Sequence, residues 1–220
     1  MSSEEDAVEV NEEAAKEETS KIILLGGSDS SDEPKIRKIM LYGEVSEETA
    51  KDTIAAMILM SDTAEVEEPV DPEDPESELK KVIQPFEMIV STHGGAADDM
   101  FSVYDMMRYI RETVDIETFG LGKVMSAGTL LLAAGTKGKR KIGKHCRVMI
   151  HSVIGGHIGP MHQLDNEMRE VRSIQESYIK AICDETNLTE KKLRSILKRK
   201  VNVYLTAEEA VEHGFADIIV

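Results

Sequence analysis

Short apolar runs alternate with longer amphipathic stretches over most of the chain. The strand-like runs are KIMLY (38–42), FEMIVS (86–91), IETFGL (116–121) and RVMI (147–150). Apolar residues at helical spacing predict helices that begin after Ser46 and at 97–111, 129–135, 161–185, 188–198 and 207–212. This alternation predicts an α/β domain with a largely parallel sheet, whose binding groups lie in the turns after strand C-termini. The glycines of HGGA (93–96) indicate one such turn.

Two acidic segments interrupt this pattern. Residues 1–20 have a net charge of −7 and residues 62–78 a net charge of −9, so together they account for the whole formal charge of −16. We expect residues 1–35 to be a disordered N-terminal segment before a domain at 36–220. Residues 62–78 contain three prolines and are expected to form a solvated loop inserted in that domain. Their acidity argues against unspecific binding of nucleic acid.

Length, cysteines and hydropathy narrow the class of protein further. A chain of 220 residues suits one domain with a substantial core. Cys146 and Cys183 lack the spacing of a disulfide framework or a zinc site, so we expect a reducing compartment and no metal. Neither a signal-peptide pattern nor an apolar run long enough for a bilayer is recognised. We therefore expect a cytoplasmic protein that does not enter a membrane.

Ser126 stands out in the stretch GKVMSAGTLLLAAG (122–135), between a strand-like run and a predicted helix. N–H groups at a helix N-terminus favour negative charge, so an oxyanion formed beside Ser126 would be stabilised. A serine before a helix is also a common N-cap, and the local sequence alone favours that interpretation. The turn is not a GxSxG nucleophile elbow, because Val124 stands two residues before the serine.

A serine nucleophile needs a base, and the chain offers six histidines, namely His93, His145, His151, His157, His162 and His213. His151 follows the strand-like run RVMI, at the edge where the turns are expected to meet. Spacing alone does not select it. The apolar stripe within 161–185 indicates a core or subunit-interface helix and not a cofactor site.

Several motifs in order resemble the ClpP family, the proteolytic subunits of the Clp ATP-dependent proteases. They are LYGEVSEETA (41–50), STHGGAADDMFSVYDMMRYI (91–110), GKVMSAGTLLLAAGTKGKR (122–140), RVMIHS (147–152) and YLTAEEAVEHGFADIIV (204–220). The resemblance covers about residues 38–220, and 62–78 looks like an insertion. It implies a ClpP/crotonase-type α/β fold of stacked strand–helix turns, with a protruding handle helix at about 160–184.

The same resemblance implies a serine endopeptidase. Ser126 would attack the scissile carbonyl, and His151 would accept its proton and pass it to the leaving amine. The backbone N–H groups of Gly95 and Ala127 would hold the oxyanion. The third triad position falls on Asn202, where the family has Asp. Asparagine can orient an imidazole but cannot stabilise an imidazolium by charge, so we expect a weakened enzyme.

Other residues depart from the family pattern near the site. His93 replaces the usual Pro before the paired glycines, and Ser152–Val153 replaces the usual Gln-Pro after the histidine. Residues 200–202 (Lys, Val, Asn) replace the charged cluster that couples two rings. Asp184 and Asp217 are possible substitutes for the missing triad carboxylate.

The resemblance also implies an assembly and leaves alternatives open. Such chains form heptameric homo-oligomeric rings that stack as tetradecamers and receive unfolded polypeptides from a Clp-type AAA+ ATPase, which alone uses ATP. The chain itself is then expected to need no cofactor. The alternatives are a catalytically weak regulatory subunit of a mixed Clp ring, an acyl-CoA hydratase or isomerase on the related crotonase fold, and a self-processing protease without an ATPase.

Overall fold

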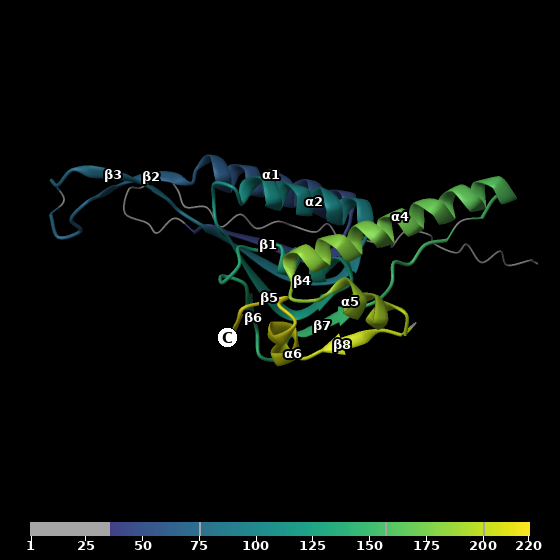
Figure 1. Cartoon of the computed structure of the whole chain (residues 1–220). Coiled ribbons are helices and arrows are strands. Elements are labelled where there is room, and N and C mark those ends of the chain that lie inside the picture. The colour runs from purple at the N-terminus through teal and green to yellow at the C-terminus, as the bar shows by residue number, and fades with distance from the viewer. Residues whose placement is uncertain (1–35, 75, 157, 200) are drawn as a thin grey trace, which may run out of the picture.

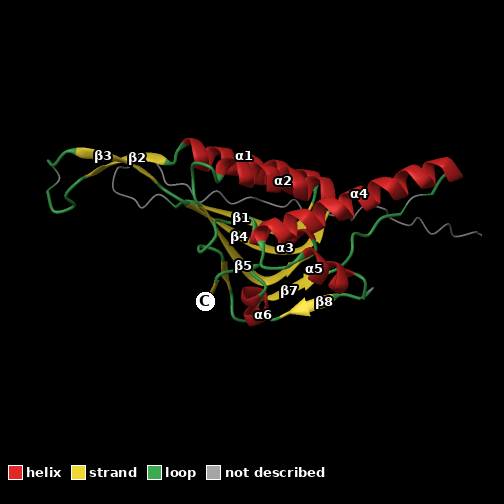
Figure 2. Cartoon of the chain, viewed as in Figure 1, coloured by secondary structure: helices red, strands yellow, loops and turns green. Residues whose placement is uncertain are grey.

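A computed structural model describes residues 36–74, 76–156, 158–199 and 201–220, so the predictions for residues 1–35 lie outside the described residues. Its centre is a seven-stranded sheet (Figure 2). The strands β1 (Lys38–Val45), β4 (Phe86–Gly95), β5 (Ile116–Met125), β6 (Lys141–Ile142) and β9 (Ile218–Ile219) lie in that order. β7 (Arg147–Ile150) pairs in parallel with the second half of β5 and antiparallel with β8 (Val203–Leu205). The predicted α/β fold with a mainly parallel sheet is confirmed.

Helices cover the sheet and one of them leaves it. α1 (Glu47–Asp62) and α2 (Ala97–Ile110) lie side by side over the sheet (Figure 1). α3 (Ala127–Ala133) packs between β4, β5 and α4 (Met161–Glu185), and α5 (Glu190–Leu197) and α6 (Ala207–Glu212) follow. The long helix predicted for 161–185 is confirmed, and its N-terminal part projects beyond the body (Figure 1).

Local sequence explains where α1 begins. The Ser46 hydroxyl accepts a hydrogen bond from the Thr49 N–H, and the Thr49 hydroxyl accepts one from the Ser46 N–H at 2.9 Å. This reciprocal capping box satisfies two backbone donors that the first helical turn leaves without partners. Glu47 and Glu48 follow in the first turn, where negative charge favours the helix dipole.

The core lies between the sheet and the helices that cover it. Phe86, Met88 and Val90 stand at alternate positions of β4, and each of them is at most 1% exposed. All seven residues of α3 are buried, in keeping with its sequence AGTLLLA, in which Thr129 is the one polar residue. Burying one large apolar side chain contributes about 1.5–3 kcal/mol, so α3 is held mainly by packing and not by helix propensity.

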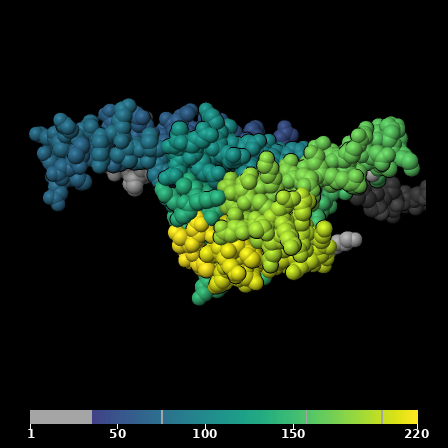
Figure 3. Space-filling model, in the orientation of Figure 1, coloured from purple at the N-terminus to yellow at the C-terminus, as the bar shows by residue number. Residues whose placement is uncertain are grey.

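The prediction that residues 62–78 form a loop is wrong for part of that segment. Asp62 ends α1, and β2 (Glu65–Pro69) pairs antiparallel with β3 (Leu79–Ile83) in a separate two-stranded sheet. The acidic strand is tolerated because Glu67 and Glu68 lie opposite Lys81 and Lys80. This hairpin and the free end of α4 project from opposite ends of the body (Figure 3).

The turn predicted at HGGA (93–96) is also wrong, because β4 continues through Gly95. Gly94 and Gly95 pair with Glu44 and Val45 of β1 after a register shift. A Cβ on Gly95 would lie 2.0 Å from the Val45 carbonyl oxygen, so glycine is required here for close approach of two strands. The change of direction follows at Ala96, which precedes α2.

Candidate active site

Ser126 connects the end of β5 to the start of α3 in an unusual backbone conformation. With φ 53° and ψ −121°, it is the one non-glycine residue with positive φ in the described part of the chain. Conformations of this kind cost on the order of 1–3 kcal/mol and cluster at functional sites. The Ser126 N–H donates to the Met149 carbonyl at 2.9 Å, which fixes the turn against β7.

The side chain of Ser126 does not cap α3. It accepts no hydrogen bond from the first helical turn, whereas the Ser126 carbonyl accepts from the Thr129 N–H at 3.0 Å and from the Thr129 hydroxyl at 2.7 Å. The residue thus stands at the N-cap position, but its hydroxyl does no capping. The interpretation that the local sequence favoured is wrong, and the hydroxyl remains free for another role.

Gly94 packs directly against Ser126. Its φ is +105°, and a Cβ at this position would lie 2.5 Å from the Ser126 Cβ and 3.0 Å from its Oγ. The Gly94 N–H donates to the Thr92 hydroxyl at 2.9 Å. The end of β4 and the serine turn therefore fit together only because residue 94 has no side chain.

A cavity of about 350 Å³ joins the ends of β4, β5 and β7. Ser126, His151, Gly95 and Ala127 all line it, so the structure brings together four of the five residues predicted for the site. The rest of the wall is mainly apolar and consists of His93, Ala96, Ala97, Met100, Val153, Ile154, Ile174 and Tyr178. Ala127 opens α3, where an N–H has no partner within the helix.

Two wall residues belong to the stripe of α4 that the sequence indicates as core or interface. Ile174 and Tyr178 face the cavity, and the Tyr178 hydroxyl lies 2.8 Å from the Thr129 hydroxyl of α3. Burial raises the pKa of Tyr178 to about 12, so the phenol is neutral at physiological pH. α4 thereby fixes α3, which begins directly after Ser126. No local signal could reveal this contact, because the two residues are far apart in sequence.

His151 follows β7 and turns one ring nitrogen toward its own main chain. Its Nδ1 lies 2.5 Å from the Ser152 carbonyl oxygen. Within the described residues, no hydrogen bond joins His151 to the Ser126 hydroxyl or to Asn202. In apo structures catalytic hydrogen bonds are often long and tighten only with substrate.

Asn202 directly precedes β8, whose antiparallel partner β7 directly precedes His151, and it does not line the cavity. Ile150 pairs with Val203, so one further step of this antiparallel register sets His151 opposite Asn202. The Asn202 side chain is exposed, and it is not among the residues that line the cavity. Extension of the register would bring Asn202 to His151, but among the described residues no hydrogen bond joins the two side chains.

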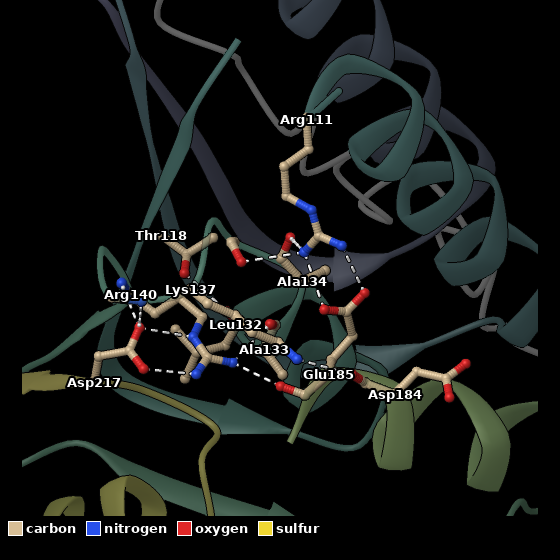
Figure 4. A network of polar contacts seen from close by, with 12 residues as sticks. Arg111, Thr118, Leu132, Ala133, Ala134, Lys137, Arg140, Asp184, Glu185 and Asp217 are labelled. Carbon is tan, nitrogen blue, oxygen red and sulfur yellow. Dashed lines mark hydrogen bonds and ion pairs between the residues drawn. The ribbon is translucent and has the colours of Figure 1, made fainter. Parts of the chain in front are cut away.

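A buried polar network holds the other end of α3 (Figure 4). Arg111 donates to the Ala134 carbonyl at 2.6 Å and forms a bidentate pair with Glu185, at 3.0 and 2.9 Å. Arg140 donates to the Ala133 carbonyl at 3.0 Å. These cations satisfy carbonyls at the C-terminal end of α3 and complement the negative end of its dipole. α3, which begins directly after Ser126, is thus fixed at both ends.

Asp217 is fully engaged in this network. Its Oδ1 and Oδ2 accept from Arg140 at 2.6 and 2.8 Å, and Oδ2 also accepts from the Gly138 N–H at 2.7 Å. Burial acts to raise the pKa of Asp217, but these hydrogen bonds outweigh it and hold the pKa below its ordinary value. Asp217 is therefore not available to orient His151. Within the described part of the chain, Asp184 accepts a hydrogen bond from Lys137 through its main-chain carbonyl, at 3.0 Å, and its carboxylate makes none.

We expect Asp217→Asn to lower the free energy of unfolding at pH 7 by about 1–3 kcal/mol, because hydrogen bonds to a charged acceptor are lost. A carboxyl with a depressed folded-state pKa stabilises the fold above its unfolded pKa, and this contribution disappears as pH falls through the folded pKa. The free energies of unfolding of the variant and wild type should therefore converge as pH falls below the ordinary pKa of aspartate and through the lower folded-state pKa of Asp217. Chemical denaturation across pH measures this difference. Asp105→Asn, at an exposed position, is the control. If Asp217→Asn lowered the free energy of unfolding as much at acidic pH as at pH 7, the stabilising role of the Asp217 carboxylate would be contradicted.

The chain matches a known protein family over most of its length. The family model described as Clp protease matches residues 77–220, which is more than half of the chain. The matched region includes Gly95, Ser126, Ala127, His151 and Asn202, together with α4. The mixed α/β architecture with its mainly parallel sheet is that of the ClpP/crotonase type. The chain belongs to the Clp protease family.

Proposed function

We propose that this chain is a serine endopeptidase in which Ser126 is the nucleophile and His151 the general base. The observation that carries the proposal is the shared cavity. Ser126, whose backbone is strained and whose hydroxyl does not cap α3, lines it together with His151 and the two proposed oxyanion-hole residues. Backbone strain and free hydroxyl are both typical of an activated serine at a strand-to-helix turn.

The proposed reaction follows from these positions. The Ser126 oxygen attacks the scissile carbonyl carbon, and its proton moves to His151. The negative charge that forms on the carbonyl oxygen is held by the N–H groups of Gly95 and Ala127. The imidazolium then gives its proton to the leaving amine, and water resolves the acyl-enzyme by the reverse sequence of proton transfers. The apolar wall formed by Met100, Ile154 and Ile174 suits an apolar substrate side chain.

We further propose that the active form is an oligomeric ring of the Clp type, a heptamer stacked as a tetradecamer, which a Clp-type AAA+ ATPase supplies with unfolded polypeptide. Family membership supports this proposal. So does α4, because its projecting part bears exposed apolar side chains, including Met161, Leu164 and Met168. Apolar surface of this kind commonly marks a protein contact. Asn202 takes the third triad position by resemblance alone, and in the described part of the chain no hydrogen bond joins it to His151. Because no carboxylate stands at this position, we propose a weakened enzyme.

A second candidate is a catalytically weak subunit that regulates an active partner in a mixed ring. The observation that favours it is the missing hydrogen bond between His151 and Asn202 in the described part of the chain. Such a subunit would assemble but would show no hydrolysis of its own.

Hydrolysis of a short fluorogenic peptide by the purified, assembled chain tests these proposals. Short peptides need no ATPase, so the assay isolates the chemistry of the ring itself. We expect slow but measurable hydrolysis. Assembled rings without hydrolysis would favour the regulatory subunit, and hydration of an enoyl-CoA substrate would instead indicate the acyl-CoA chemistry of the crotonase fold.

A further inference from the structure

The ring nitrogen that a triad carboxylate would normally bind is already occupied in His151. Nδ1 lies 2.5 Å from the Ser152 carbonyl oxygen. A carbonyl oxygen can only accept a hydrogen bond, so Nδ1 carries the proton of the neutral ring and Nε2 is left as an acceptor. This is the tautomer that a general base for Ser126 needs.

The loop that presents this carbonyl is fastened on both sides. The Ser152 hydroxyl donates to the Leu197 carbonyl at 3.1 Å, at the end of α5. The Val153 N–H donates to the Gln175 side-chain oxygen at 2.8 Å, on α4. A proline at position 153 would have no N–H for this bond. The peptide unit between residues 152 and 153 is therefore held on two sides. Gln175 binds its N–H group, and the end of α5 binds the Ser152 hydroxyl.

Gln175 is half-buried, and among the described residues only one of its two polar side-chain atoms has a hydrogen-bond partner. Its Nε2 is buried and has no hydrogen-bond partner among the described residues. A buried donor without a partner costs free energy, and leucine or methionine would avoid that cost. Gln175 therefore contributes through Oε1, which accepts a hydrogen bond from the Val153 N–H.

We propose that the Ser152 main-chain carbonyl orients His151 in place of a triad carboxylate, and that Gln175 is the positioning residue that holds this carbonyl. The inference rests on the proposed peptidase function and deepens it. During attack the Ser126 proton goes to Nε2, while the Nδ1 proton stays hydrogen-bonded to the Ser152 oxygen. The carbonyl selects the tautomer but carries no full charge, so it stabilises the imidazolium less than a carboxylate does. Asn202 is then dispensable for orientation.

The test compares kcat and KM for a short fluorogenic peptide among four variants of the full chain. Gln175→Met removes the acceptor at similar length, and Gln175→Glu keeps it. Asn202→Ala removes the alternative orienting group. Gln163→Met makes the same exchange at an exposed position of the same helix and is the control. Light scattering and circular dichroism verify that each variant assembles.

We expect Gln175→Met to lower kcat by about 10- to 100-fold with little change in KM, because the base is misplaced and not the substrate. Gln175→Glu should retain most of kcat, and Asn202→Ala and Gln163→Met should stay within about two- to threefold of wild type.

Three results would overturn the inference. They are a wild-type kcat in assembled Gln175→Met, a loss in Gln175→Glu as large as in Gln175→Met, and a loss in Asn202→Ala of about 10-fold or more. If Gln175→Met does not assemble, the two other variants test the inference. Gln175→Glu should then retain most of kcat, and Asn202→Ala should lose less than about 10-fold. Failure of the proposed function is distinct, because it would appear as no hydrolysis by wild type or as hydrolysis that survives Ser126→Ala.

Discussion

Ser126→Ala should reduce hydrolysis of a short peptide to the background of the assay, a fall in kcat of at least about 10²-fold. Removing the serine from a complete triad costs about 10⁶ in kcat. A histidine that lacks a carboxylate partner can make the starting enzyme up to about 10⁴-fold slower, so the remaining difference is smaller. The hydroxyl makes no capping hydrogen bond, so the variant should fold and assemble as wild type does.

Ser102→Ala is the matched control for this experiment. Ser102 is an exposed serine on α2, and its hydroxyl donates to the Asp98 carbonyl one turn earlier, at 2.9 Å. Its removal should leave kcat and KM unchanged. Hydrolysis that persists in assembled Ser126→Ala rings would show that another group performs the attack.

Gly94→Ala should lower kcat by about 10²–10³-fold, although residue 94 performs no chemistry. A Cβ there would lie 2.5 Å from the Ser126 Cβ and 3.1 Å from the Met125 carbonyl oxygen. The turn that carries Ser126 must therefore move away from β4, and the distance from the nucleophile to the Gly95 N–H changes with it. Positive φ at an alanine adds on the order of 1–3 kcal/mol of strain.

Gly122→Ala separates these two effects. Gly122 also has positive φ, +63°, but a Cβ on it would meet nothing within 4 Å. We expect this variant to lose stability without losing kcat. Steady-state kinetics and thermal unfolding of both variants measure the difference. Equal losses of kcat in the two variants, or full activity of Gly94→Ala, would contradict the account of how β4 supports the serine turn.

Sequence patterns predict the parts of this fold that depend on local periodicity. The strand at 147–150 and the helix at 161–185 have their predicted bounds. The strand is a short apolar run, and the helix combines apolar residues at helical spacing with Pro160 directly before its first residue. The shared location of Ser126 and His151 follows from a general rule. Met125 and Ile150 end neighbouring parallel strands, and the C-terminal ends of such strands meet at one edge of a sheet.

Features that depend on contacts between distant residues could not be predicted. The acidic run at 65–69 becomes a strand because Lys80 and Lys81 lie opposite its glutamates. Gly94 and Gly95 extend a strand because β1 and the serine turn approach them closely. The contact between Gln175 and Val153 joins two elements that have no common pattern in the sequence.

The N-cap interpretation of Ser126 failed for a related reason. A serine before a helix usually adopts an extended backbone that lets its hydroxyl reach the first turn. Here the bond from the Ser126 N–H to Met149 and the packing of Gly94 impose a positive φ. Both causes come from other strands, so the residues around the serine give no indication of them.

Reaction of the assembled protein with a fluorophosphonate, followed by mapping of the adduct by mass spectrometry, tests the central claim most directly. This reagent phosphonylates a serine only where a base and an oxyanion hole activate it, so it reports the chemistry of the cavity without any choice of substrate. We predict one adduct, on Ser126, which is absent from unfolded protein and strongly reduced in His151→Ala. Folded, assembled rings that form no adduct on Ser126 would contradict the claim that this serine is the nucleophile.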